Sequence, residues 1–111
     1  MTPSELISEV KKLPFEEIRN NSANLFEMVI RTDRKKELDV VLGRYFGSAL
    51  KSAGDPPNEQ LSQRVAVHGG IRKEQTLYHL ECEGVSGYAM LWPWANGILI
   101  TVKIVHNAQK K

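Results

Sequence analysis

Histidine and glutamate side chains alternate along one segment in the second half of the chain. His79, Glu81 and Glu83 are two residues apart, so they would share one face of an extended strand, with His68 in a preceding segment. Neutral imidazoles beside a carboxylate can bind zinc. The spacing matches no metal-binding signature, however, and it is more typical of the solvated face of a strand. We therefore predict no metal ion and no other cofactor.

The chain has one cysteine, a potential nucleophile with a nearby histidine as its base. Cys82 and His79 are three residues apart, however, and such residues point to opposite faces of a strand. Cys82 has the same parity as Tyr78 and Leu80, which we expect in the core, so its thiol should be buried and inert. We predict no catalytic residues, and the sequence leaves open whether the chain is an enzyme.

Two tryptophans lie near basic residues in the last third of the chain, a combination that can stack on nucleic-acid bases. The expected strand register turns Trp92 and Trp94 towards the helices, which makes them core side chains. The formal net charge is only +2, from 15 basic and 13 acidic residues. Because this balance gives no strong electrostatic footprint for a polyanion, nucleic-acid binding ranks third among the functions considered.

The length of 111 residues fits one domain, and we expect residues 1–111 to fold as one α+β unit. Hydrophobic residues make up 41% and charged residues 25%, ordinary for a globular protein. A single cysteine excludes an internal disulfide and favours a reducing compartment. The N-terminal residues do not resemble a signal peptide, and no apolar run could span a bilayer. We therefore expect a cytoplasmic protein without a membrane partner.

The first helix should begin at the N-terminus of the chain. Thr2 and Glu5 have the spacing of a capping box, with Pro3 in the first turn. Pro14 should end this helix near Lys12, because proline cannot continue a helix.

A second clear helix follows residue 31, capped by Thr32 or Asp33 and stopped by Gly54. Its apolar stripe recurs at spacings of three and four and consists of Leu38, Val41, Leu42, Tyr45, Phe46, Ala49 and Leu50. The segment from Phe15 to Ile30 fits a helical face. Within it, residues 25–30 are apolar almost all round, and a strand is the alternative there.

The second half of the chain has the period of two that is typical of strands. Four strands are expected, over residues 64–68, 75–83, 88–92 and 98–105. The predicted fold is therefore α+β, with two or three N-terminal helices packed on one face of a four-stranded antiparallel sheet formed by the C-terminal half.

Asn96-Gly97 marks a hairpin between the last two strands. A three-residue loop, residues 95–97 with Gly97 at positive φ, pairs Trp94 with Ile98 and places Pro93 where no N–H is needed. This register divides the side chains between two faces. One holds Tyr88, Met90, Trp92, Trp94, Ile98, Ile100, Val102 and Ile104, and the other holds Ala89, Leu91, Pro93, Leu99, Thr101, Lys103 and Val105.

The leading functional hypothesis is a non-enzymatic interaction domain that forms a homodimer. The helices have enough apolar surface for one sheet face, and the other face is too apolar to stay in water. The expected interface consists of Leu91, Leu99, Thr101, Lys103 and Val105. The alternative is a small-molecule pocket or enzyme, with His68, Tyr78, His79, Trp92 and Trp94 near its mouth.

Overall fold

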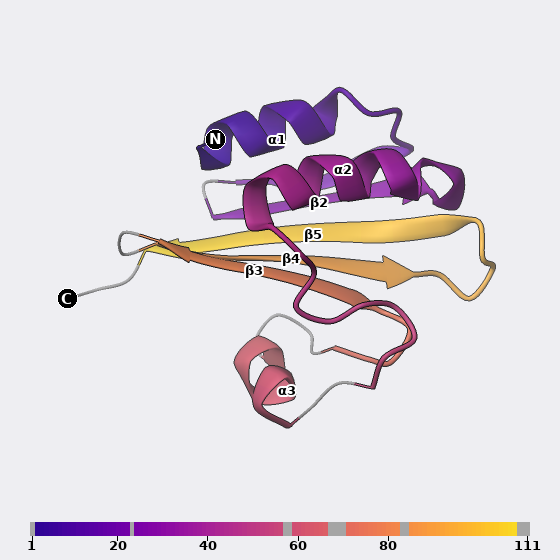
Figure 1. Cartoon of the computed structure of the whole chain (residues 1–111). Helices are drawn as coiled ribbons and strands as arrows, with labels where there is room; N and C mark the ends of the chain where they lie inside the picture. Colours follow the sequence, from indigo (N-terminus) through magenta and orange to yellow (C-terminus); the bar gives the residue numbers. More distant parts are fainter. Residues whose placement is uncertain (1, 23, 57–58, 67–70, 83–84, 109–111) are drawn as a thin grey trace.

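Five antiparallel strands form one sheet, and two helices lie on one of its faces (Figure 1). The computed structural model describes residues 2–22, 24–56, 59–66, 71–82 and 85–108. The elements are α1 (Pro3–Lys11), β1 (Glu17–Asn21), β2 (Leu25–Arg31), the 3-10 turn η1 (Thr32–Arg34), α2 (Lys35–Phe46), α3 (Glu59–Val65), β3 (Thr76–Cys82), β4 (Val85–Pro93) and β5 (Leu99–Ala108). The strand order is β1-β2-β5-β4-β3, so the predicted α+β class is confirmed.

The capping box of α1 is present as predicted. The Thr2 hydroxyl accepts the Glu5 backbone N–H at 3.1 Å, and the Glu5 carboxylate accepts the Thr2 N–H at 3.2 Å. These hydrogen bonds from Thr2 hold the pKa of Glu5 below its usual value. The helix ends at Lys11, with Lys12 as its C-cap, three residues before Pro14.

The segment between the helices forms the hairpin β1–β2. The strand alternative therefore holds for residues 25–30, whereas the helix predicted for residues 17–21 is wrong. Phe26, Met28 and Ile30 alternate on the helix-covered face and are almost fully buried. Val29 points to the opposite face and is only 1% exposed, which explains why this segment looks apolar all round. Because β2 pairs with β5, the predicted four-stranded sheet is corrected to five strands, two of them from the N-terminal half.

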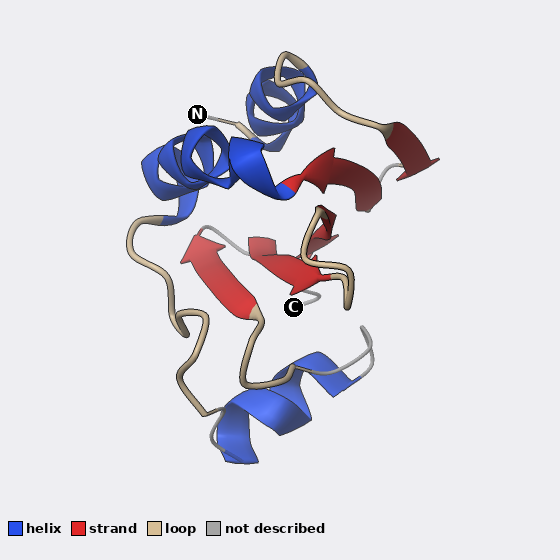
Figure 2. Cartoon of the chain, turned by 90° about the vertical axis from the view of Figure 1, so that its right-hand side faces the viewer, coloured by secondary structure: helices blue, strands red, loops and turns tan. Residues whose placement is uncertain are grey.

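The strand expected at residues 64–68 is wrong. Residues 59–65 are helical in α3, and residues 67 and 68 lie outside the described part of the chain. Figures 1 and 2 show α3 on the opposite side of the sheet from α1 and α2. The other three predicted strands match β3, β4 and β5 in position.

The limits of α2 also differ from those predicted. Neither Thr32 nor Asp33 caps it, because both belong to η1, and α2 begins at Lys35 without a side-chain cap. The helix stops at Gly47, whose φ of 80° lies in the left-handed region, rather than at Gly54. Leu50 therefore falls outside the helix and is 47% exposed.

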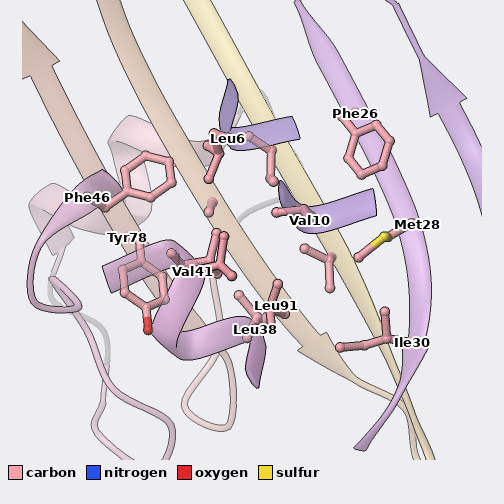
Figure 3. Close-up of a cluster of buried hydrophobic side chains, with 14 of the residues drawn as sticks. Leu6, Val10, Phe26, Met28, Ile30, Leu38, Val41, Phe46, Tyr78 and Leu91 are labelled. Atoms are coloured by element: carbon pink, nitrogen blue, oxygen red, sulfur yellow. The ribbon is translucent and has the colours of Figure 1, made fainter. Parts of the chain in front are cut away.

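The core lies between the two N-terminal helices and the sheet. Figure 3 shows Leu6 and Val10 of α1 and Leu38 of α2 among the side chains of the strands, as the predicted apolar stripe requires. The buried residues of this cluster are Leu6, Val10, Phe26, Met28, Ile30, Leu38, Val41, Leu42, Phe46, Tyr78, Ala89, Leu91, Ile100, Val102 and Ile104. Within the described residues, no helix is both long and apolar enough to cross a membrane.

The β4–β5 turn has four residues, 95–98, so the predicted three-residue loop is wrong. The Trp94 N–H donates to the Leu99 carbonyl at 2.9 Å, and Pro93 pairs with Ile100. Ile98 precedes β5, and its carbonyl accepts the Thr32 N–H at 2.7 Å on the side of β2. Gly97 has positive φ, as predicted, at 71°. Pro93 still lies at a position that needs no N–H. Hydrogen-bonded and non-hydrogen-bonded pairs alternate along the ladder, and the neighbouring pair of Trp94 with Leu99 is the hydrogen-bonded one.

This register reverses the predicted faces of β4. Tyr88, Met90 and Trp92 share a face with the odd-numbered residues of β5, whereas Ala89 and Leu91 lie under the helices. The face away from α1 and α2 has its own buried cluster, consisting of Ile71, Leu77, Tyr88, Met90 and Val105, with Leu25 and Trp92 packed against it.

Candidate ligand-binding groove

The residues of the predicted dimer interface do not share one surface. Leu91 is fully buried under the helices, whereas Leu99, Thr101, Lys103 and Val105 lie on the opposite face. Thr101 and Val105 are only 6% and 5% exposed within the single chain. Of the five residues, only Leu99 and Lys103 therefore offer part of their side chains to a partner.

The residues of the predicted pocket are also separated. The Tyr78 hydroxyl donates to Asp39 at 2.8 Å on the helix side of the sheet. Burial, with this contact to Asp39, raises the pKa of Tyr78 well above its usual range. His79 lies on the other face and stacks on Tyr88, with ring centres 4.6 Å apart. His68 is outside the described residues.

The two tryptophans lie on the face away from α1 and α2, contrary to prediction. The Trp94 indole N–H donates to the Thr101 hydroxyl at 2.8 Å, and the Arg19 guanidinium lies 5.4 Å from the Trp94 ring centre. The Lys103 ammonium lies 5.2 Å from the Trp92 ring centre. The Trp92 indole N–H is buried and has no acceptor among the described residues.

Lys51 is a buried lysine with a structural role. Its ammonium donates to the carbonyls of Ser52 at 3.1 Å, Lys73 at 2.8 Å and Gln75, which uses all three of its protons. Burial lowers the pKa of Lys51, and the carboxylates of Asp55 and Glu74 oppose that shift. The side chain therefore ties two loops together and is not available as a nucleophile.

A groove of about 390 Å³ lies between α1 and the turn that joins β1 to β2. Ser4, Ser8 and Lys11 face it together because residues at i, i+4 and i+7 share one side of a helix. The described residues that line it are Pro3, Ser4, Ile7, Ser8, Lys11, Asn21, Ser22 and His106.

The groove has one fixed cation. The Lys11 ammonium lies 5.7 Å from the ring centre of Phe26 in β2, so the side chain extends towards the sheet. None of the described residues that line the groove is acidic. Three hydroxyls, an amide and an ammonium therefore surround a space without a neutralising carboxylate, which favours anionic or strongly polar ligands.

His106 completes the groove from β5. Its Nε2 lies 3.1 Å from the Tyr45 hydroxyl of α2, and its backbone N–H donates to the Asn24 carbonyl at 2.9 Å. Burial lowers the pKa of His106 below its usual value, which favours the neutral form of the ring. A half-buried histidine with a shifted pKa, placed in a groove, is a candidate functional residue.

Two smaller hollows, of about 130 and 320 Å³, lie on either side of Arg31. Phe15 lines the first and Ile98 the second, and both are exposed, at 42% and 51%. Arg31 lies near Asp33 at 3.4 Å and Glu16 at 4.0 Å, so the charges there nearly balance. The groove at α1 is larger and carries one sign of charge, and it is the stronger candidate.

Sequence reasoning missed the groove because its residues come from segments far apart in the chain. The available signals were local. Ser4, Ser8 and Lys11 form a polar stripe beside the apolar face of α1, and Gly87 interrupts an otherwise apolar strand.

Comparisons with known proteins add no assignment: no protein-family model matches the sequence, and neither a curated protein nor a solved structure matches the chain.

Proposed function

We propose that this chain is a binding domain that takes a small anionic ligand, such as a phosphate or carboxylate group, in the groove between α1 and the β1–β2 turn. The observation that carries the proposal is the charge of the lining: Lys11 and His106 line the groove together with three serines, and none of the described lining residues is acidic. Lysine is a common partner for phosphate, and hydroxyl groups complete the hydrogen bonds that such an anion accepts.

Titration with inorganic sulfate, followed by calorimetry, tests this proposal. Lys11→Gln should weaken binding by about 10- to 100-fold, because a hydrogen bond to a charged group contributes about 1.5–3 kcal/mol. Lys12→Gln is the matched control, since the Lys12 side chain is 71% exposed and pairs with Glu9 at 2.6 Å. Equal affinities in the wild type and the Lys11→Gln variant would contradict the proposal.

Self-association is a second candidate function, with a smaller surface than the sequence suggested. Leu99, Lys103, Trp92 and Trp94 are partly exposed around the face away from α1 and α2. A second copy of the chain related by a two-fold axis could cover these side chains. We therefore propose a homodimer that forms only through this smaller surface.

Weak nucleic-acid binding is the third candidate. The cations over both tryptophan rings, Arg19 and Lys103, are the observation in its favour, because bases stack on such side chains while cations contact phosphates. Arg19 also pairs with Glu17 at 2.9 Å, which reduces the net charge available there. The single cysteine still favours a cytoplasmic location.

A further inference from the structure

His106 lies directly across the backbone of a glycine. Gly87 of β4 pairs with His106 of β5 in the antiparallel ladder. A Cβ atom at position 87 would lie 2.9 Å from His106 Cδ2 and 3.1 Å from Nε2, closer than real Cβ contacts allow. The ring can therefore occupy this place only because residue 87 has no side chain.

Two aromatic side chains of α2 complete the surroundings of the ring. Tyr45 meets His106 edge to face, with ring centres 5.7 Å apart at 84°, and places its hydroxyl on Nε2. Phe46 lies 3.5 Å from the same position above Gly87 and packs against Tyr45 at 4.7 Å. The socket formed by Gly87, Tyr45 and Phe46 thus holds the Cδ2–Nε2 edge of the imidazole.

Among the described residues, the groups around the His106 ring carry no negative charge. Lys11 from α1 lines the same groove, Tyr45 contacts the ring from α2, and Gly87 of β4 carries no charge. The Asn24 carbonyl and the polar side chains of Asn21 and Ser22 complete the list from the β1–β2 turn. Partial burial opposes protonation of His106.

A bound anion would reverse this balance, because an opposite charge within a few ångströms stabilises the imidazolium form. We propose that His106, positioned by the socket of Gly87, Tyr45 and Phe46, makes anion binding in this groove proton-linked, so that an anion and a proton are taken up together. This inference rests on the function proposed above and specifies its ligand as an anion bound together with a proton. Gly87 is a positioning residue in this arrangement, since it acts only through His106.

The test is the pH dependence of sulfate affinity, because sulfate itself does not titrate near neutral pH. Between about pH 7.5 and 5.5, a window around the ordinary pKa of imidazole, wild-type affinity should rise as the pH falls. A rise of about one unit in the pKa of His106 on binding corresponds to an increase of about tenfold. His106→Gln should bind sulfate more weakly at the low end and show little dependence on pH.

Gly87→Ala should lose the same pH dependence, because the added Cβ displaces the ring. Gly43→Ala is the matched control, since a Cβ there would meet nothing within 4 Å. Adding Gly87→Ala to the His106→Gln variant should not lower the sulfate affinity further, because Gly87 acts only through His106. If Gly87 had only a structural role, the second substitution would lower the affinity again. If Gly87→Ala does not fold, the His106 ring signals of the wild type, titrated by NMR with and without sulfate, give the pKa change directly.

The possible results separate the two proposals. A chain that binds no sulfate at any pH in this window overturns the proposed function and this inference together. Sulfate binding that depends on Lys11 but not on pH, or that is unchanged in His106→Gln, overturns only the proton linkage.

Discussion

At the scale of a single residue, the burial of His106 makes the free energy of unfolding depend on pH. Burial lowers its pKa in the folded protein from the ordinary value of 6.5. The unfolded chain therefore binds a proton at a higher pH than the folded chain does. Above this window both states are neutral, and the residue contributes no pH dependence to the free energy of unfolding.

We expect the free energy of unfolding to decrease as the pH falls through 6.5 towards the lower folded-state pKa of His106. Chemical denaturation at several pH values, in a buffer without phosphate or sulfate, measures this slope. The His106→Gln variant should show a smaller slope over the same range. Identical slopes in both proteins would show that His106 does not titrate differently in the folded state.

The two tryptophans provide a matched pair of substitutions. Trp94→Phe removes the indole hydrogen bond to Thr101 and should destabilise the fold by about 1 kcal/mol. Trp92→Phe removes an N–H that is buried without an acceptor among the described residues. Removing this unsatisfied donor should offset part of the free energy that is lost with the packing of the indole ring. Urea denaturation of both variants compares the two. A larger loss for Trp92→Phe would mean that its N–H has a partner in solution.

At the scale of the elements, α2 is the main cover of the helix-side core. Leu42, Phe46 and Ile100 are 0%, 6% and 1% exposed, which confirms the burial predicted for them from the sequence. Phe46 also contributes to the His106 socket. The helix therefore supports both the core and the candidate site.

Phe46→Ala should cost about 3–5 kcal/mol in the free energy of unfolding, because it leaves a cavity between α2 and the sheet. Val40→Ala is the control on the same helix, since Val40 is 56% exposed and should change stability by less than about 0.5 kcal/mol. Both values follow from denaturant unfolding. Equal effects of the two substitutions would show that α2 does not cover the core in solution.

Local chemistry made several elements predictable. The capping box of Thr2 and Glu5, the period of two in β3 and the left-handed Gly97 each depend on residues close together in the sequence. The hairpin register was not predictable in this way. In the folded chain β5 also pairs with β2, and the Thr32 N–H donates to the Ile98 carbonyl across a separation of 66 residues (98 minus 32).

The candidate site was less predictable than the fold for the same reason. Ser8, Asn21 and His106 each resemble an ordinary surface polar residue in the sequence. Only the pairing of β2 with β5 and the packing of α1 bring them around one groove. Of the predicted pocket residues, Tyr78 and His79 lie on opposite faces of the sheet, because consecutive residues of a strand point to opposite sides.

At the scale of the whole molecule, the sheet is covered on both faces to different extents. The helices cover one face, and a cluster around Leu77 and Met90, both fully buried, occupies the other. The single chain therefore buries most of the surface that was predicted to need a second copy.

Leu99→Lys tests the remaining self-association surface. If a dimer forms there, light scattering of the wild type should give twice the 12.5 kDa of one chain, and the variant should give a monomer. Lys36→Glu, at an exposed position on α2, is the control and should leave the mass unchanged. A wild-type mass near 12.5 kDa would rule out the dimer and leave the groove as the functional surface.

Mapping sulfate binding by NMR tests the central claim most directly. In a titration of isotope-labelled protein, we expect the largest amide shifts on residues 4–11, 21–22 and 106, which surround the groove. The Lys11→Gln variant should lose most of these shifts at the same sulfate concentration. An absence of saturable shifts, or a set centred on Arg31 and Arg34, would contradict an anion-binding groove between α1 and the sheet.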